Sequence, residues 1–511
     1  MTLPTAAPRS AANDDGRRPS IFRETPGAFW RVEQATRAAM IVDAEDYFTH
    51  LRAAMLKARR RIVLVGWDFD ARIAFAGGGG DGGPEAIGEF ITWLVRRRPE
   101  LQVHILRWDT GTLKALFHAG TLLTVLRWIR DPQIHLKLDS HHPVAGSHHQ
   151  KVVVIDDDVA FCGGIDMTRR RWDSRAHADH EPRRRNPDGS PYGPWHDAAM
   201  ALEGPAARAL GDMSRERWRA AGGRKLEPVE TGGDCWPDDL APDFQDVEVG
   251  ISRTLPAMRD CGAVHEIEEL YVALIARARR WIYAESQYFA SRRIAEAIAR
   301  RLHEADGPEV VIVNPITADG WLEPIAMDSA RARLVAALRE CDLHNRFRIY
   351  HPVTAAGRPI YVHAKVMVID DEILRVSSSN FNNRSLRLDT ECDVTLDPAG
   401  DDPAGASSIR RIRNALLAEH LGSDPATVEA ILSTTGSLIV TIAGLSSRGR
   451  GLQPFEHGEL PAVQRWLADT KLLDPEGPAE MFEPLARRTP LLKRLLHRHD
   501  GAGPPGGRAR S

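Results

Sequence analysis

Two copies of one short pattern, H-x-K-x4-D, carry the side chains of this sequence that could do chemistry. The copies comprise His149, Lys151 and Asp156 in the first half of the chain and His363, Lys365 and Asp370 in the second. A neutral imidazole can attack phosphorus, and a protonated imidazole can give its proton to a leaving alcohol. Two ammonium groups can hold the phosphoryl oxygens and stabilise charge in the transition state. Two copies that face each other would therefore suit cleavage of a phosphodiester, and we expect neither a metal ion nor a cofactor.

Each motif opens a pair of strands joined by an acidic turn. The first copy predicts strands at 152–155 and 159–162, and the second copy predicts strands at 366–369 and 373–376. Side chains alternate between the two faces of a strand, so the His and Lys of each motif, two residues apart, point the same way. The motif aspartates follow the first strand of each pair. We expect them to support the fold more than to take part in the chemistry.

The similarity of the two halves extends beyond the motifs. An arginine-rich segment leads into an apolar strand at 62–66 in the first half and at 282–284 in the second, and another strand follows at 101–106 and at 309–313. Strands that alternate with helical segments predict an α/β sandwich. The chain of 511 residues also exceeds the usual size of a single hydrophobic core. We therefore expect a duplicated α/β domain.

Composition predicts where these domains begin and end. The first residues are polar and contain Pro and Gly, which is typical of disorder. A second segment rich in Pro, Gly and acidic residues indicates a linker. The chain is thus predicted to contain a disordered N-terminus, a first domain, a linker, a second domain and a basic amphipathic or disordered tail, at residues 1–22, 23–228, 229–246, 247–485 and 486–511.

Charge and cysteine content indicate a cytoplasmic protein that does not bind nucleic acid. The formal net charge is -3, whereas a nucleic-acid-binding domain is usually basic. The five cysteines include no C-x-x-C pair, which indicates free thiols in a reducing compartment. The first 20 residues have no apolar core of a secretory signal, and the longest apolar stretch, 437–445, is too short to cross a bilayer. We expect any membrane contact to be peripheral, on the inner face.

Histidines gather around the first motif. They are His141, His142, His148, His149, His177 and His180. Such a cluster could hold a metal ion, or it could belong to a loop that carries one catalytic His among polar neighbours. No Cys and no pair of acids nearby completes a ligand set, so we favour the second interpretation. The arginine run 183–185 is either a solvated face or a contact for anionic headgroups. The basic segment 491–499 could pack on its own domain or lie on an anionic membrane.

The two motifs resemble the HKD motifs of the phospholipase D superfamily, and the resemblance covers roughly residues 28–420. Segments 163–173 and 194–206 resemble those that follow the first motif in plant and other eukaryotic phospholipases D. Segment 285–289, E-S-Q-Y-F, resembles the E-N-Q-Y-F of those enzymes. The S-S-S-N run at 377–380 resembles G-S-A-N, with Ser377 in place of the family's glycine.

The resemblance implies two pseudo-symmetric α-β-α sandwich domains that share one active site. It implies that His149 is the nucleophile, which forms a phosphohistidine, and that His363 is the general acid and then the base. Each His should be oriented by a carboxylate, as in catalytic triads. Glu391 is the candidate for one His, and Asp197 is the candidate for the other.

The resemblance also implies a set of substrate contacts. They are Asn380, as a phosphate-binding side chain, with Gly164, Asp166, Gln287 and Ser378. Nuclease-like members often carry Asn where this chain has Asp166, so the acid favours a lipid over a nucleic acid.

The function expected from the sequence is hydrolysis of phosphatidylcholine-like glycerophospholipids to phosphatidic acid and the headgroup alcohol, with transphosphatidylation to small alcohols. A cardiolipin-synthase-like phosphatidyltransferase is the first alternative, and we expect N-terminal membrane segments in such an enzyme. A nucleic-acid phosphodiesterase is the second, and the near-neutral charge disfavours it. A scaffold with a dead site is disfavoured by the two intact motifs. We expect a monomer, because the duplication supplies both motifs.

Overall fold

The computed structural model describes most of the chain between Pro19 and Glu456. The described residues are 19–75, 82–109, 119–143, 146–230, 233–258, 261–318, 327–398, 402–446 and 449–456. The predicted tail at 486–511, with the basic segment 491–499, lies outside them.

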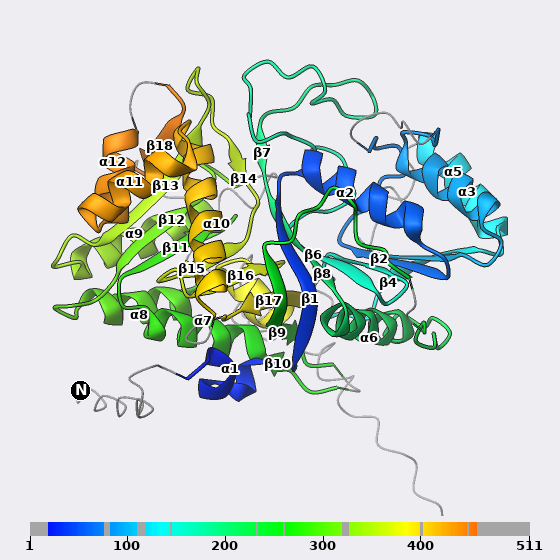
Figure 1. The fold of residues 1–511 in the computed structure, drawn as a ribbon, viewed down its shortest axis with the longest axis horizontal. Coiled ribbons are helices and arrows are strands. Elements are labelled where there is room, and N and C mark those ends of the chain that lie inside the picture. The colour runs from blue at the N-terminus through cyan, green and yellow to red at the C-terminus, as the bar shows by residue number, and fades with distance from the viewer. Residues whose placement is uncertain are drawn as a thin grey trace, which may run out of the picture.

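One mixed sheet of 16 strands runs through both halves (Figure 1). At its centre β1 (Arg31–Val42) and β9 (Phe244–Leu255) pair in antiparallel fashion. Outward from β1 the order is β8 (Ala198–Glu203), β6 (Val159–Gly163), β5 (Val152–Ile155), β2 (Arg61–Gly66), β3 (Gln102–Trp108) and β4 (Ile134–Asp139). Outward from β9 it is β17 (Glu391–Leu396), β16 (Ile373–Ser377), β15 (Val366–Ile369), β11 (Trp281–Glu285), β12 (Glu309–Val313), β13 (Phe347–Val353) and β18 (Gly451–Pro454). The short β10 (Val264–His265) pairs with β9.

Apart from β10 and β18, the two halves of the sheet match strand for strand. The outer strands β2–β3–β4 and β11–β12–β13 are parallel, whereas the motif strands β5 and β15 run antiparallel to their neighbours on both sides. The strands are apolar because both faces are covered. In β2, for example, Val63 and Val65 face one core, and Ile62 and Leu64 face the other. This arrangement confirms the predicted pseudo-symmetry.

Helices cover both faces of the sheet. One face carries α6 (Pro205–Ala220), α10 (Pro403–Leu421), α11 (Pro425–Thr435) and α12 (Leu438–Leu445). The other face carries α2 (Ala44–Lys57), α3 (Ile87–Arg97) and α5 (Ala119–Arg130) in the first half. In the second half it carries α1 (Ile21–Glu24), α7 (Glu266–Arg277), α8 (Arg292–Leu302) and α9 (Ser329–Cys341). The predicted α-β-α fold class is therefore confirmed.

Both predicted disordered or linking segments contain packed residues. Ile21 and Phe22, placed in the disordered N-terminus, are buried in the core of the second half, and the backbone N–H of Ile21 donates to Asp397 Oδ2 over 2.6 Å. In the predicted linker, Cys235 and Trp236 are buried against the first half, and β9 already begins at Phe244. The apolar side chains within these polar segments account for the difference, because they can be buried against a neighbouring domain.

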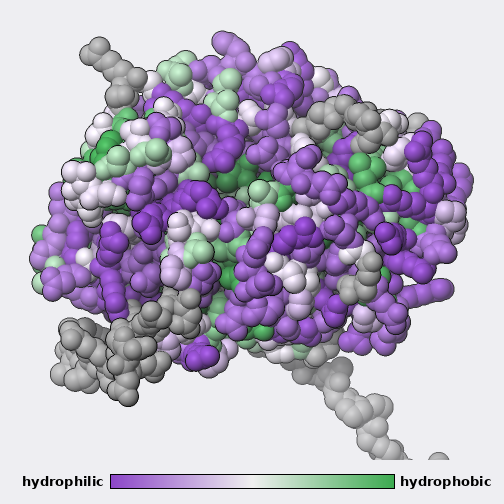
Figure 2. Space-filling view, viewed as in Figure 1, coloured by the Kyte–Doolittle hydropathy of each residue, from purple (hydrophilic) through white to green (hydrophobic). Residues whose placement is uncertain are grey.

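All five cysteines are free thiols. No helix among the described residues has the length and hydropathy needed to span a bilayer. Hydrophilic side chains cover most of the face seen in Figure 2, and hydrophobic residues form small groups along the centre and over the end near α11 and α12.

Candidate active site

Two short backbone pairings bring each motif to the opposite half. The segment before the second motif, β14 (Tyr361–Val362), pairs in parallel with β7 (Trp195–His196) of the first half. The segment before the first motif forms the corresponding bridge from His148 to Thr390 of the second half. Each pairing stops one residue short of a carboxylate. The register therefore places each motif His beside an acid from the other half.

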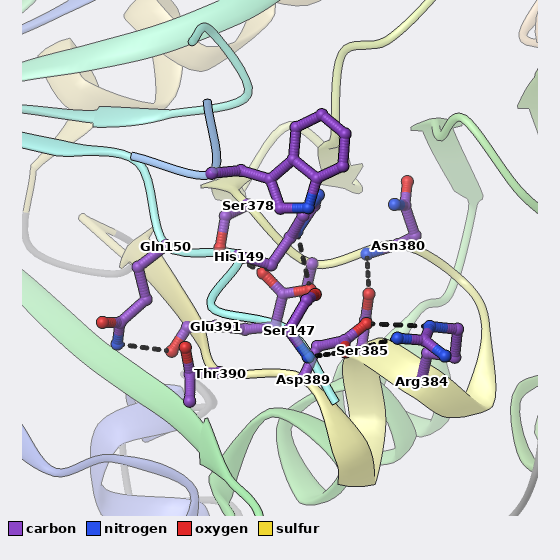
Figure 3. A network of polar contacts seen from close by, with 12 residues as sticks. Ser147, His149, Gln150, Ser378, Asn380, Arg384, Ser385, Asp389, Thr390 and Glu391 are labelled. Carbon is purple, nitrogen blue, oxygen red and sulfur yellow. Dashed lines mark hydrogen bonds and ion pairs between the residues drawn. The ribbon is translucent and has the colours of Figure 1, made fainter. Parts of the chain in front are cut away.

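The two carboxylates predicted to orient the imidazoles lie where this register puts them. His149 Nδ1 is 3.0 Å from both Oε1 and Oε2 of Glu391 (Figure 3). His363 Nδ1 is 2.7 Å from Asp197 Oδ2. The sequence did not indicate which of the two carboxylates pairs with which motif His. In the structure each half supplies the acid for the His of the other half, so the site is complete only when both halves are present.

The two motif lysines have different partners. Lys151 Nζ lies 3.1 Å from Asp166 Oδ2 and donates to the carbonyl oxygen of its own motif His over 3.0 Å. Lys365 also donates to the carbonyl of its motif His, but its side-chain partner is the amide oxygen Oε1 of Gln287, 3.4 Å away. Asn380 Nδ2 lies 3.4 Å from that same oxygen, and the buried Asn380 Oδ1 has no partner among the described residues. Lys365, Gln287 and Asn380 thus form a polar group able to meet phosphoryl oxygens.

The site is an enclosed, positively charged environment. Burial, followed by the charges of Lys151 and Lys365, holds the pKa of His149 well below its usual range. Burial and Lys365 lower the pKa of His363 in the same way. Burial also lowers the pKa of Lys365 to about 7 and raises that of Glu391 to about 8. Both imidazoles are therefore neutral before substrate binds, as a nucleophile must be.

The motif aspartates hold backbone and do not face the histidines. Asp156 accepts hydrogen bonds from the backbone N–H groups of residues 59, 60 and 61, at 2.6–2.8 Å. Asp370 accepts from those of residues 279, 280 and 281, at 2.7–2.9 Å. Each carboxylate fixes the start of the strand next to the motif strand of its half, β2 beside β5 or β11 beside β15. Both aspartates therefore support the backbone of the fold.

Each half of the chain matches a separate family profile. The sequence profile described as "Phospholipase D" matches residues 54–234, and the profile described as "Cardiolipin synthase, PLD-like domain" matches residues 271–402. The chain belongs to the phospholipase D superfamily.

Curated relatives of this superfamily member include plant enzymes. It is 25% identical to phospholipase D alpha 2 of Oryza sativa subsp. japonica over 74% of this chain and 63% of that protein. It is 25% identical to phospholipase D alpha 1 of Arabidopsis thaliana over 76% of this chain and 65% of that protein. The chain thus spans just under two thirds of the length of these relatives.

A solved structure shares the fold. The crystal structure of phosphatidylserine synthase from Haemophilus influenzae Rd KW20 superposes with a TM-score of 0.54 at 14% identity. The match covers 83% of this chain and 99% of that one. At this identity the likeness concerns the fold alone.

Three of the residues predicted to contact the substrate lie against the motif side chains or the carboxylates that pair with them. Ser378 Oγ donates to Glu391 Oε2 over 2.5 Å, and Asp166 pairs with Lys151. Gly164 lies against Asp197, where an added Cβ would come within 2.1 Å of the Oδ1 atom. Any larger residue at this glycine would displace the acid that orients His363.

Ser377 stands where the family has glycine, and its hydroxyl forms a hydrogen bond within the site. Its Oγ donates to the carbonyl oxygen of Lys365 over 3.2 Å, and the side chain is fully buried. The replacement therefore adds a hydrogen bond to the second motif strand.

An aromatic group beside the second motif was not predicted from the sequence. The ring of Trp195 stacks on Tyr361 with centroids 4.5 Å apart and lies 5.2 Å from the ring of His363. The guanidinium of Arg171 lies 4.3 Å from the Trp195 ring centroid. Tyr361 is fixed in turn, because its hydroxyl accepts a hydrogen bond from Gln287 over 2.9 Å. These rings enclose the second imidazole.

A buried cluster behind the second motif could hold a cation. Asp43, His177, His196 and Glu419 are all buried, and their donor atoms lie within 4.8 Å of one another. His177 Nε2 is 3.1 Å from Glu419 Oε1 and 3.4 Å from Asp43 Oδ2, and His196 Nδ1 is 2.8 Å from Glu419 Oε1. Donors of a tetrahedral ion bound at about 2.1 Å lie roughly 3.4 Å apart, so the spacing fits. The argument against a metal, that no acid pair completes a ligand set, does not hold in the structure.

Carboxylates fix the outer nitrogens of these two histidines. His177 Nδ1 is 2.9 Å from Asp173 Oδ2, and His196 Nε2 is 2.9 Å from Glu285 Oε2. This arrangement is common around metal-binding histidines. Burial lowers the pKa of His177, but the carboxylates of Asp43, Asp173 and Glu419 more than offset this effect and raise that pKa to about 9. The cluster also supports the site, since the backbone carbonyl of His196 accepts the N–H of His363 over 2.7 Å.

The arginine run 183–185 is divided between two environments. Arg184 is buried, with Nη1 3.1 Å from Asp173 Oδ2. Arg183 is exposed and pairs with Glu45 and Glu181. The exposed part corresponds to a solvated face, and the buried arginine braces the cluster.

Proposed function

We propose that this chain cleaves glycerophospholipids between the phosphate and the headgroup, releasing phosphatidic acid and the headgroup alcohol through a phosphohistidine. One observation carries the proposal. Both motif imidazoles are held through Nδ1 by a carboxylate of the opposite half, and neither His149 Nε2 nor His363 Nε2 has a hydrogen-bond partner among the described residues. Two oriented rings with free Nε2 atoms are what a double displacement at phosphorus requires.

The first step makes the covalent intermediate. His149 Nε2 attacks phosphorus, and the bond from phosphorus to the headgroup oxygen breaks. That oxygen takes the proton carried by His363 Nε2 and leaves as an alcohol. Glu391 stabilises the positive charge that the attacking ring acquires, and the two lysines stabilise the phosphoryl oxygens.

The second step restores the enzyme. His363 removes a proton from water, whose oxygen attacks phosphorus, and the bond between phosphorus and His149 breaks. Burial, and after it the charges of Lys365, Arg171 and Lys151, lowers the pKa of His363. The phosphodiester anion offsets those charges on binding, which raises the pKa of His363 and favours its protonation. An alcohol in place of water would give transphosphatidylation by the same route.

Phosphatidylcholine-like lipids are the substrates we propose to test first. The plant relatives, named phospholipase D, support this choice. The profile matched by the second half, named for cardiolipin synthase, supports phosphatidyl transfer to a lipid alcohol as the second candidate. We propose that the chain meets its substrate peripherally, as a monomer, and that the two steps need no metal ion.

The test measures choline release from phosphatidylcholine vesicles with and without EDTA, for the wild type and for His149→Ala and His363→Ala. A control variant, His180→Ala, changes a His outside the site. We expect release by the wild type and the control in both buffers and loss in both motif variants. No release from any glycerophospholipid would contradict the proposal. Release that EDTA abolishes and a divalent cation restores would contradict metal independence and direct attention to the buried cluster.

A further inference from the structure

Asp43 lies at the junction between β1 and α2, buried, with an unusual backbone conformation. Its φ angle is 67° and its ψ angle is 157°, a combination that is adopted almost only by glycine. A side chain persists in such a conformation only where its surroundings hold it, and strained residues of this kind are concentrated at functional sites. The contacts of Asp43 show what a side chain contributes at this position.

Both backbone polar groups of Asp197, the acid beside His363, are hydrogen-bonded to Asp43. The N–H of Asp197 donates to Asp43 Oδ1 over 3.0 Å, and the carbonyl oxygen of Asp197 accepts the N–H of Asp43 over 2.8 Å. The two residues meet because Val42 of β1 lies opposite Ala198 of β8. Glycine in place of Asp43 would relieve the backbone strain, but it would lack the oxygen that accepts the N–H of Asp197.

The side chain of Asp197 connects this backbone contact to the second motif. Asp197 Oδ2 lies 2.7 Å from His363 Nδ1, and Asp197 Oδ1 accepts the backbone N–H of Ala198 over 2.9 Å. In the proposed reaction His363 gives a proton to the leaving headgroup and then removes one from water. A displaced Asp197 would turn the imidazole away from both oxygens, so the hold of Asp43 on Asp197 bears on both proton transfers.

The acid of the first motif is held differently. Glu391 Oε2 accepts a hydrogen bond from the hydroxyl of Ser378 over 2.5 Å, so a side chain holds that carboxylate directly. Asp43 forms no hydrogen bond or ion pair with His149 or Glu391 in the part of the chain that the structure describes. Asp43 is therefore coupled to one of the two imidazoles, that of His363.

We propose that Asp43 is a positioning residue for the general acid and base: it fixes the backbone of Asp197, and through Asp197 it orients the imidazole of His363. This inference rests on the proposed function, which assigns the two proton transfers to His363. Loss of Asp43 should slow the steps in which His363 transfers a proton and should leave the attack by His149 largely intact.

The first experiment compares two substrates whose leaving groups differ in basicity. Asp43→Ala should lower kcat for choline release from phosphatidylcholine by about 10–100-fold with little change in KM, since a small misplacement of a catalytic group can cost about a hundredfold. On bis(p-nitrophenyl) phosphate, whose leaving group needs little acid, the rate of the first nitrophenol burst should stay within about threefold of the wild type. Phosphohistidine should accumulate, because the attack of water still needs a base.

Asp43→Asn is the conservative variant. Its amide keeps an oxygen that can accept the N–H of Asp197, so kcat for choline release should stay within about threefold of the wild type. Asp43 also lies 3.4 Å from His177 Nε2 and 3.2 Å from His196 Nδ1. If Asp43→Asn lost as much activity as Asp43→Ala, the charge facing these histidines would be the important feature, and the inference would be overturned.

Asp43→Gly separates positioning from folding. This variant removes the strain together with the oxygen, so it should fold even where Asp43→Ala does not, and it should show the same kinetic defect. Equal losses of the nitrophenol burst and of choline release, in Asp43→Ala or Asp43→Gly that circular dichroism shows to be folded, would overturn the inference.

Asp243→Ala is the matched control. Asp243 holds β1 by a similar pair of contacts: its N–H donates to the carbonyl oxygen of Ala38 over 2.9 Å, and its Oδ2 accepts the N–H of Met40 over 2.9 Å. Within the described residues it forms no hydrogen bond or ion pair with Asp197 or with a motif histidine. The ratio of choline release to the nitrophenol burst should therefore remain that of the wild type, and a ratio that fell as in Asp43→Ala would contradict the role given to Asp43.

The two substrates also separate this inference from the proposed function. The selective defect of Asp43→Ala on the phosphodiester, without hydrolysis of any glycerophospholipid by the wild type, would reject the proposed function and keep the positioning role. Choline release by the wild type, with equal losses in both steps for the Ala and Gly variants, would keep the function and reject the positioning role.

Discussion

The first and second motifs have the same fold around them but not the same surroundings. The side chain of His149 is 15% exposed, and that of His363 is 5% exposed beneath Trp195. Lys151 faces a carboxylate, whereas Lys365 faces an amide. Duplication has thus given two copies of one scaffold, and the contacts have since diverged.

The difference indicates a division of labour. The more open His149 suits a nucleophile that a bulky phosphodiester must reach. The enclosed His363 suits a group that exchanges a proton with a leaving oxygen and then with one water molecule. Among the described residues no carboxylate lies within ion-pair distance of Lys365, so its charge can meet the substrate, and burial makes that charge depend on pH.

Removing each imidazole in turn is the strongest test of the different roles of His149 and His363. We expect His149→Asn and His363→Asn each to lower kcat/KM by about 10⁴-fold or more. The variants should differ on a p-nitrophenyl phosphodiester, whose leaving group needs little acid. His363→Asn should then release about one equivalent of nitrophenol and accumulate phosphohistidine, because the second step still lacks its base.

Rapid-quench kinetics and mass spectrometry of the quenched protein test this assignment. His149→Asn should give no burst and no phosphorylated His. A burst in that variant, with phosphate on His363, would reverse the two roles.

Loss of either motif lysine should have the next largest effect on activity. Lys151→Met and Lys365→Met should each lower kcat by about 10²–10³-fold, as expected for the loss of one group that stabilises transition-state charge. Because Lys151 is held by Asp166 and Lys365 is not, the double variant Lys151→Met/Asp166→Asn should resemble the single lysine variant. Steady-state kinetics of the variants check this. A double variant that is much worse would show that Asp166 acts on the substrate independently.

The pH profile should separate the two lysines further. The pKa of Lys365 is lowered to about 7, so this side chain loses its proton, and with it the charge that binds phosphate, as pH rises through that value. Activity should therefore fall on the alkaline side of about pH 7. Arginine stays protonated, so Lys365→Arg should move the alkaline limb upward even if the rate at lower pH is reduced. Profiles of kcat/KM across the neutral range test this, and a limb that moves instead in Lys151→Arg would contradict it.

Much of this site could be predicted from the sequence because its residues belong to repeated local patterns. The strand pairs, the motif side chains and the buried α-β-α layers follow from alternation and apolar runs that occur twice. The pairing of His149 with Glu391 could not be predicted, since the two residues are 242 positions apart and meet only through the packing of one half on the other.

The buried cluster was missed for the same reason. His177 was visible in the sequence as one of several histidines, but Glu419, one of its acids, comes from α10, also 242 residues away. The burial of Trp236 in a segment rich in Pro and acids likewise depends on a domain surface that local composition does not report.

The smallest effect on activity should come from the motif aspartates, where the two halves agree most closely. Asp156→Ala and Asp370→Ala each remove an acceptor of three backbone N–H groups, which should lower the free energy of unfolding by about 2–4 kcal/mol. Denaturant unfolding measures that loss, and turnover per folded molecule should stay within about threefold of the wild type, because neither carboxylate faces an imidazole. Similar losses for the two variants would show that the supports remained equivalent while the catalytic groups diverged. If turnover fell about a hundredfold or more for only one of them, in a protein that stays folded, that aspartate would have a direct part in the chemistry, and the asymmetry of the motifs would extend to all three of their residues.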